Sequence, residues 1–466
     1  MKNPRIGLLP LYIALYDEAV PKLRNELQPF LDGVAAAFRA RQADVAVAPI
    51  CCVNAEFRQA LAAFDANPVD LIVTLHLAYS PSLESAELLA QRQEPILMLD
   101  VTPDAAFGRD VDPGRLLYNH GVHGVQDLAC MLRRLRKHYE VVAGHLSDPA
   151  VMDRALTVVR AATAASALRQ CRVLRVGPVF ENMGDFQVDE GVLAKVLGLR
   201  ADTIAPLALA RDVEAVTATE VEAERQADLQ AFAADLDVDV HRRSLRLGLG
   251  LRRYLERGHY TALSMNFLAF DQGEGPVCTV PFLECSKAMA RGLGYAGEGD
   301  VLTAGLVAAL NTGFGPTSFT EIFCPDWAGG TLFLSHMGEF NPLLAAGKPR
   351  LYEKPFPFTP AQNPACLALA PEPGPATFTN LAPGPDDTFR LIMAPVEILG
   401  DGTHPDAKQW IRAWIKPRGR VETFLEEYSR LGGTHHCAIL PGDHTAGLLA
   451  FARLAGIEGV LLDAGL

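Results

Sequence analysis

The sequence predicts an α/β protein with two doubly wound parallel-sheet domains, followed by a C-terminal mixed domain that contains an antiparallel β-barrel-like unit. Three observations predict this fold. Short apolar runs alternate with amphipathic segments over the first 150 residues, and this alternation resumes near residue 170. After residue 317 the segments become shorter and richer in Pro, Gly, Thr and Phe. Alternating strands and helices are typical of a parallel sheet with helices on both faces. We therefore expect domains at 1–165, 166–317 and 318–466.

The first predicted domain has five apolar runs with amphipathic segments between them. Strands are expected at 5–13, 44–52, 71–77, 95–101 and 140–146, and helices at about 18–42, 54–66, 82–92 and 122–137. No GxGxxG pattern follows the first run, so the fingerprint of a dinucleotide-binding domain is absent where it would be expected.

The second predicted domain repeats this alternation and ends in a glycine-framed turn. Its expected elements are helices at about 150–169, 211–235, 239–257 and 281–293, strands at 171–177 and 260–270, and a turn opening a helix within 297–315. After residue 317 the segments become shorter and richer in Pro, Gly, Thr and Phe, as in an antiparallel unit. The Pro-rich stretch 355–375 is expected to be a surface loop, and helices return at 421–430 and 444–455.

Composition and charge exclude several classes of function. The chain has 466 residues and a formal charge of −13, which argues against nonspecific nucleic-acid binding, because that needs a clustered basic surface. Its nine cysteines show no CxxC spacing, as expected of reduced thiols in a cytosolic protein. No apolar stretch is long enough to cross a membrane, so we predict a cytoplasmic protein without a membrane partner.

Glutamate and histidine side chains in the last third of the chain stand in contexts that suggest a site. Glu321 lies in an otherwise apolar or hydroxylic strand, where a carboxylate is costly unless it is paired, metal-bound or on the solvent face. His435 and His436 are adjacent, and adjacent residues of a strand point to opposite faces, so only one of them is expected to share a site. The full set is Glu298, Glu321, His336, His435, His436 and His444.

Two carboxylates with two imidazoles suit Mn²⁺, Co²⁺, Fe²⁺ or Zn²⁺, with water or substrate oxygens as the remaining ligands. No close HxxxH or CxxC spacing accompanies these residues. Spacing alone therefore leaves a metal site and solvated strand residues as open alternatives.

Four motifs in this region resemble those of the L-arabinose isomerase family, within the wider L-fucose/L-arabinose isomerase fold. They are GYAGEGDVLTAGL, TSFTEIF, SHMGEFNP and LGGTHHCAI, which occur in family order between residues 294 and 439. Three segments further upstream, NHGVHG, ENMGDF and MNFLAF, are also similar to family segments. The resemblance covers most of the chain and is weak over the first 110 residues.

The resemblance implies a metal-dependent aldose–ketose isomerase that acts on a small sugar. Its four metal ligands map onto Glu298, Glu321, His336 and His436, and Mn²⁺ is the first expectation for the metal, with Co²⁺, Fe²⁺ and Zn²⁺ as alternatives. Three further residues match positions near the sugar: His435, Met183 and Phe267.

The resemblance also implies a homo-oligomer. His123 matches a histidine that reaches the active site of a neighbouring subunit in the family, which predicts a trimer or a hexamer. The segment LLPLYIALY at 8–16 replaces the family's sugar-gripping GSQHLYG, Ile322 replaces an Asp, and Cys437 replaces a Thr. These departures leave the predicted metal ligands intact and leave the sugar unassigned.

Isomerisation requires removal of a weakly acidic C–H proton next to a carbonyl, through a cis-enediol. We predict Glu298 as the base at C2 and Glu321 as its partner at the oxygens; the reverse assignment, or one Glu as a ligand only, remains open. Two other functions are alternatives: a metal-dependent hydrolase or lyase on the same residues, and a noncatalytic sugar-binding or regulatory protein.

Overall fold

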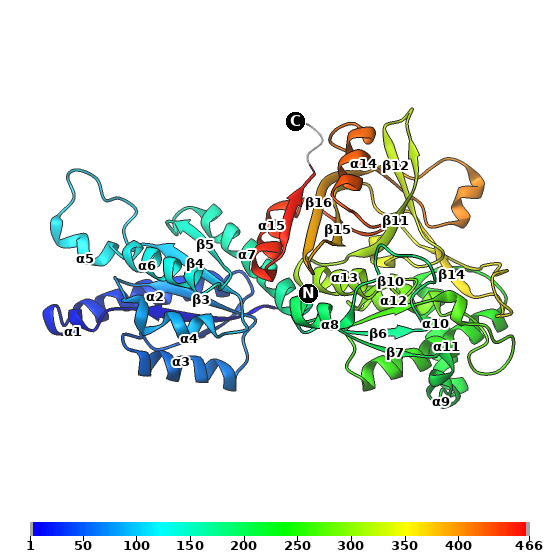
Figure 1. Ribbon diagram of the computed structural model, residues 1–466, viewed down its shortest axis with the longest axis horizontal. Helices are drawn as coiled ribbons and strands as arrows, with labels where there is room; N and C mark the ends of the chain where they lie inside the picture. Colours follow the sequence, from blue (N-terminus) through cyan, green and yellow to red (C-terminus); the bar gives the residue numbers. More distant parts are fainter. Residues whose placement is uncertain (1–2, 463–466) are drawn as a thin grey trace. The chain divides into compact units, whose positions relative to one another are not determined.

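The computed structural model describes residues 3–462, and the chain forms two compact units (Figure 1). The first comprises Met1–Ser166 with Ala446–Gly456, and the second comprises Ala167–Thr445 with Ile457–Leu466. The predicted fold class is confirmed: two sheets are parallel and the C-terminal sheet is mixed and mainly antiparallel. The three-way domain division stays a prediction, since the second unit holds both the central sheet and the C-terminal one.

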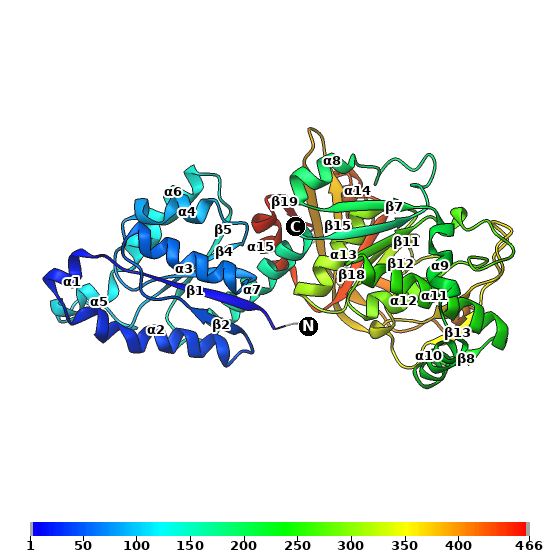
Figure 2. The same ribbon diagram turned by 90° about the horizontal axis from the view of Figure 1, so that it is seen from below.

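The first unit is a five-stranded parallel sheet with the strand order β2-β1-β3-β4-β5. Helices α3, α4 and α6 pack on one face through a continuous apolar cluster, and α2 lies on the other (Figure 2). The strands are β1 (Arg5–Leu11), β2 (Asp44–Val47), β3 (Leu71–His76), β4 (Ile96–Val101) and β5 (Tyr139–Gly144). The helices are α1 (Leu15–Ala19), α2 (Leu23–Arg39), α3 (Asn54–Ala66), α4 (Ala86–Ala90), α5 (Leu116–Asn119), α6 (Val122–Arg134) and α15 (Thr445–Ala455).

The boundary between the units falls near the end of α7 (Pro149–Arg169), and the second unit then forms a four-stranded parallel sheet of order β10-β9-β6-β7. Its strands are β6 (Arg172–Val176), β7 (Arg200–Ile204), β9 (Ala262–Met265) and β10 (Gly294–Gly297). Its helices are α8 (Glu190–Val192), α9 (Ala210–Glu214), α10 (Ala218–Ala231), α11 (Val238–Arg257), α12 (Phe282–Ala290) and α13 (Val301–Gly313). A small sheet joins β8 (Ala233–Asp235), β13 (Arg350–Glu353) and β14 (Ala365–Ala368).

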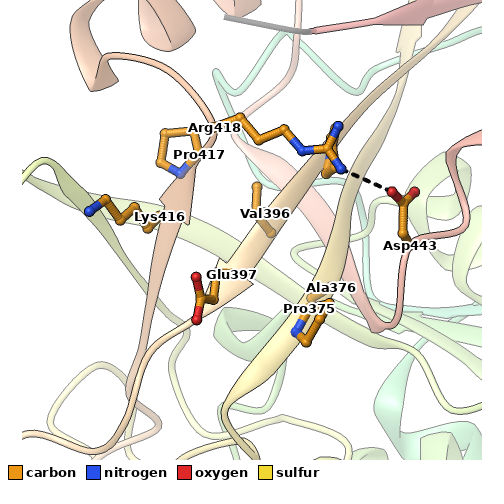
Figure 3. Close-up of a pocket in the computed structure, with 9 residues that line it drawn as sticks. Pro375, Ala376, Val396, Glu397, Lys416, Pro417, Arg418 and Asp443 are labelled. Atoms are coloured by element: carbon orange, nitrogen blue, oxygen red, sulfur yellow. Dashed lines mark hydrogen bonds and ion pairs between the residues drawn. The ribbon is translucent and has the colours of Figure 1, made fainter. Parts of the chain in front are cut away.

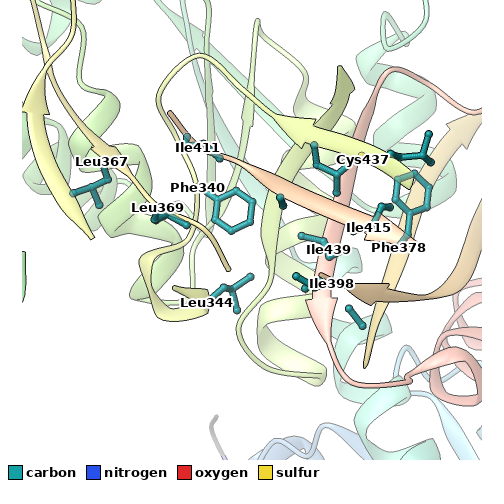
Figure 4. Packing of buried hydrophobic residues seen from close by; sticks show 14 of the residues in the cluster. Phe340, Leu344, Leu367, Leu369, Phe378, Ile398, Ile411, Ile415, Cys437 and Ile439 are labelled. Atoms are coloured by element: carbon teal, nitrogen blue, oxygen red, sulfur yellow. The ribbon is translucent and has the colours of Figure 1, made fainter. Parts of the chain in front are cut away.

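Six antiparallel strands of this unit close into a barrel, because β16 pairs with both β15 and β17 in the order β15-β18-β11-β12-β17-β16. Buried side chains such as Phe378, Ile415 and Ile439 fill its interior (Figure 4). The strands are β11 (Ser318–Asp326), β12 (Thr331–Ser335), β15 (Gly374–Pro383), β16 (Phe389–Ile398), β17 (Ala413–Pro417) and β18 (His436–Pro441). β19 (Glu458–Leu461) adds to β16 in parallel, and α14 (Val421–Arg430) precedes β18.

Helix α13 joins the two sheets of the second unit. It contacts β6, β9 and β10 of the central sheet and also β11, β15 and β18 of the barrel. Because both of its faces are covered, all of its residues except Thr312 are buried, and none of them is charged. Among the described residues, no helix is both long and apolar enough to span a membrane.

Gly294 sets how closely α13 approaches β10. A Cβ atom there would lie 2.0 Å from the Ala304 carbonyl oxygen and 2.6 Å from the Ala308 nitrogen, both in the helix backbone. We expect Gly294→Ala to destabilise the protein by about 1–3 kcal/mol, because the backbone has to shift. Urea denaturation measures this, and Gly400→Ala is the control, since a Cβ at Gly400 meets nothing within 4 Å. Equal stabilities of the two variants would contradict the expectation.

Candidate metal centre

Glu298 occupies a strained turn between the end of β10 at Gly297 and the start of α13 at Val301. Its φ is 62°, in the left-handed region that non-glycine residues seldom adopt, and φ at Gly299 is 86°. At Gly297 a Cβ atom would lie 2.8 Å from Cε1 of His336, so the glycine lets that ring pack against the turn. The turn therefore brings Glu298 next to the imidazole.

Glu321 and His436 face each other across two barrel strands. Glu321 in β11 is directly opposite His436 in β18, so their side chains leave the same face of the sheet. Glu321 Oε1 lies 3.0 Å from His436 Nε2 and 3.5 Å from Nε2 of His336, which follows β12. Glu298 Oε2 lies 3.4 Å from His436 Nε2. Elements distant in sequence thus bring the four predicted ligands together.

These four residues are buried, and three of them carry a polar atom without a hydrogen bond. Glu298, Glu321, His336 and His436 are at most 8% exposed. Glu298 Oε2 and the Nε2 atoms of His336 and His436 have no hydrogen-bond partner, a costly state for buried polar groups. Two carboxylates and two imidazole nitrogens that converge in this way form a donor set that fits a divalent transition-metal ion.

His435 also lies at this centre. Single donor atoms of Glu298, Glu321, His435 and His436 all lie within 4.8 Å of one another, whereas His336 joins them through its contact with Glu321. The prediction that only one histidine of the adjacent pair could share the site is therefore wrong. Because β18 begins at His436, His435 precedes the strand and is free of its alternation.

All three histidines are held by a carboxylate at Nδ1, which leaves Nε2 directed at the centre. Such carboxylate–histidine pairs fix the ring orientation and the tautomer of metal-binding histidines. The contacts are His336 Nδ1 to Glu339 Oε2 at 2.7 Å, His436 Nδ1 to Asp300 Oδ2 at 2.9 Å, and His435 Nδ1 to Asp185 Oδ2 at 2.7 Å.

Sequence reasoning missed these three carboxylates, although each lies within a motif that it singled out. Asp300 ends GEGD, Glu339 lies in SHMGEF, and Asp185 lies in ENMGDF. The signal that could have indicated these carboxylates is their position. Each is an acidic residue inside a motif that also holds a predicted ligand or that resembles a segment of the family. Tyr295 extends one pair further, because its hydroxyl donates to Glu339.

Aromatic rings enclose the imidazoles. Phe186 stacks on His436 with a centroid distance of 4.8 Å and an interplanar angle of 6°. Phe319 lies edge-on to both His336 and His436, at centroid distances of 4.6 and 4.9 Å. These apolar rings cover the imidazoles on their buried side, and charges in such apolar surroundings interact more strongly than charges in water.

The carboxylates and imidazoles shift one another's pKa values strongly. Burial alone would lower the pKa of His436, but its contacts with Asp300, Glu298 and Glu321 raise it well above the usual value. Burial likewise opposes ionisation of Glu298, yet His435 and His436 lower its pKa to about 2. The hydrogen bond to Asp185 overcomes the effect of burial and raises the pKa of His435 to about 9. The glutamates are therefore carboxylates at neutral pH.

The other residues predicted for the site lie in different surroundings. Met183 is half-buried in the loop that carries Asp185. Phe267 is buried and contacts Phe180, whose backbone N–H donates to the Glu298 carbonyl. The substrate-binding roles of Met183 and Phe267 stay predictions.

Two further histidines belong to other elements of the structure. His123 belongs to α6 of the first unit, and its reach into a neighbouring subunit stays a prediction. His444 bonds the Pro441 carbonyl through Nε2 at 2.8 Å, which gives it a structural role.

Two pockets lie on the barrel. One, of about 350 Å³, adjoins the centre: His336 is part of its lining, together with Phe323, Phe333, Tyr352, Lys354 and Trp410. The other, of about 440 Å³, lies over β15, β16 and β17 and shares no residue with the centre (Figure 3). Its charged side chains are Glu397, Lys416, Arg418 and Asp443, and Arg418 lies 3.1 Å from Asp443. Neither of these two pockets is lined by Glu298, Glu321, His435 or His436.

Comparisons with known proteins give one consistent result along the chain. Models of the N-terminal, central and C-terminal domains of L-arabinose isomerase match residues 15–170, 172–313 and 316–458. An L-arabinose isomerase from Nocardioides sp. is 29% identical over 434 residues, which cover 89% of this chain and 85% of that protein. The L-arabinose isomerase from Acidothermus cellulolyticus is 27% identical, and the match covers 85% of this chain and 80% of that protein. The one from Shouchella clausii is 28% identical, and the match covers 86% of this chain and 82% of that protein.

A solved structure gives no further support. A solute-binding protein of an ABC transporter from Agrobacterium vitis, bound to α-D-tagatopyranose, covers 66% of this chain and 88% of its own at 13% identity. Its TM-score of 0.15 is too low to support a statement about fold or function.

Binding of Mn²⁺ should become tighter as the pH rises from 6 to 8. Its carboxylate neighbours raise the pKa of His436, so a cation that binds its Nε2 competes with a proton. Isothermal titration at pH 6, 7 and 8, in two buffers of different ionisation enthalpy, measures the affinity and the protons released. An affinity that does not change with pH, with no proton release, would contradict this expectation.

Proposed function

The chain belongs to the L-arabinose isomerase family, and from this premise we propose that it interconverts an aldose and a ketose with a divalent cation held by Glu298, Glu321, His336 and His436. One observation carries the proposal: two buried carboxylates and two buried imidazoles converge, and three of these side chains have a polar atom without a hydrogen bond. The family match along the chain supports the reaction type.

The difficult step is removal of the C2 proton of the aldose, since the resulting cis-enediol carries developing negative charge on two neighbouring oxygens. A divalent cation, when bound, supplies Lewis-acid stabilisation of that charge. The protein has to hold the sugar so that its reacting carbons lie against a carboxylate, and it has to keep water away.

Glu298 is proposed as the base. Its pKa is lowered to about 2 by His435 and His436, so it is a deprotonated carboxylate across the neutral range. It takes the proton from C2 and returns it to C1. Glu321, 3.0 Å from His436 and opposite it in the barrel, is the proposed partner that moves the proton between the O1 and O2 hydroxyl groups.

The metal, the assembly and the substrate class are also proposed from membership of the family. Mn²⁺ is the proposed metal and a trimer or hexamer the proposed assembly, with His123 acting across subunits. A small sugar is the proposed substrate, and its identity is left open by the changed segment at 8–16. Cytoplasmic localisation stays a prediction from composition.

The proposed activity is tested with Mn²⁺-loaded protein and a panel of pentoses, hexoses and deoxy sugars in D₂O, followed by NMR. We expect deuterium incorporation together with ketose formation for at least one sugar, and loss of both after chelation with recovery on adding Mn²⁺ back. If no sugar of the panel reacts while Mn²⁺ is bound, the proposed isomerase activity is contradicted. That result would favour a hydrolase, a lyase or a sugar-binding protein.

Glu298→Gln tests the base within the same assay. It should lower kcat by at least 10³-fold, because the amide cannot accept the C2 proton. Glu397→Gln is the matched control, since Glu397 is an exposed glutamate of the barrel in β16. If Glu298→Gln retains turnover, the base is another group, and Glu321 is the next candidate.

A further inference from the structure

We propose that Asp185 is a positioning residue, which holds His435 as a hydrogen-bonding group for the sugar and keeps it out of the metal's coordination. This inference rests on the proposed isomerase function and deepens it. The family resemblance already implies that His336 and His436 hold the metal and that His435 lies near the sugar, and the inference adds Asp185 as the residue that fixes His435.

The three carboxylate–histidine pairs differ in how far their side chains are exposed to solvent. The side chains of His436 and Asp300 are both 0% exposed, and those of His336 and Glu339 are both 1% exposed. In contrast, His435 is 40% exposed and Asp185 is 37% exposed. A sugar arrives from solvent and so meets His435 first, whereas the other two imidazoles are enclosed by protein.

Asp185 fixes His435 at two points. One carboxylate oxygen, Oδ2, accepts the backbone N–H of His435 at 2.9 Å and lies 2.7 Å from its ring Nδ1. The ring is therefore fixed relative to its own backbone, with Nε2 3.6 Å from Glu298 Oε2 and 3.8 Å from Glu321 Oε1. These contacts are longer than the 3.0 Å between His436 Nε2 and Glu321 Oε1.

The loop that carries Asp185 is tied to the rest of the centre. The Phe180 N–H donates to the Glu298 carbonyl at 2.9 Å, and Phe186 stacks on His436. Phe186 also contacts His435, with a centroid distance of 5.5 Å. Asp185 lies between these two anchors, so the loop sets the position of His435 relative to both glutamates.

The number of donor atoms also favours this division. Cations of this class accept up to six ligands. Four protein ligands would leave room for two further oxygen ligands, such as neighbouring oxygens of an aldose. A fifth protein ligand, from His435, would leave room for only one sugar oxygen. With Nδ1 bonded to Asp185, Nε2 is instead the ring atom left to form a hydrogen bond with a sugar hydroxyl.

The test compares Asp185→Asn with Asp300→Asn by Mn²⁺ titration and by steady-state kinetics on the sugar that wild type turns over. Asp443→Asn, an exposed aspartate paired with Arg418, is the control. We expect Asp185→Asn to bind Mn²⁺ within about threefold of wild type while kcat/KM falls 10–100-fold, and Asp300→Asn to weaken Mn²⁺ binding 10–100-fold. Asp185→Glu, which keeps the acceptor, should restore part of kcat/KM.

Two results in an active enzyme would overturn the proposal. If Asp185→Asn weakens Mn²⁺ binding as much as Asp300→Asn, His435 is a ligand. If Asp185→Asn changes neither Mn²⁺ affinity nor kcat/KM, Asp185 has no positioning role. His435→Gln checks the same division: it should keep Mn²⁺ affinity and lower kcat/KM. A wild-type protein that binds Mn²⁺ but isomerises no sugar refutes the proposed function itself, which is a different outcome from either of these.

Discussion

Asp300 joins the two sheets of the second unit through its two carboxylate oxygens. Oδ1 accepts the Thr303 N–H at 2.9 Å and caps α13, while Oδ2 accepts the Nδ1 proton of His436 at 2.9 Å. The turn that positions Glu298 and the strand that carries His436 are thereby held in one geometry. Because α13 packs on the central sheet and on the barrel, a shift of either sheet would change the distance between Glu298 and Glu321.

The centre concentrates charge where the protein is least hydrated. Glu298, Glu321, Asp300 and Glu339 are all below 9% exposed, and burying charged groups costs several kcal/mol each unless they are paired. The imidazoles provide that pairing, and the position of each carboxylate is fixed as a result. The strained φ of 62° at Glu298 is a further cost at the same place. Such costs are typical of a site selected for geometry rather than for stability.

The sequence predicted the class of each sheet because the alternation of apolar runs is a local property, and it placed Glu298, Glu321, His336 and His436 through their motifs. It could not predict that β18, near the end of the chain, inserts between β15 and β11, since this pairing is set by long-range packing. The paired register of Glu321 and His436 depends on that insertion. The error at His435 arose because the start of a strand cannot be located to one residue.

The centre has a buried half and an exposed half, and they are built differently. In the buried half, Glu321 and His436 belong to paired strands, and Glu298 and His336 follow strand ends whose glycine and aromatic neighbours leave little room for change. The exposed half is carried by the 177–189 loop and by His435, which precedes its strand. A loop can change its side chains without disturbing the barrel. The exposed half of the centre can therefore change its side chains more readily than the buried half, whose residues are held by strand pairing and close packing.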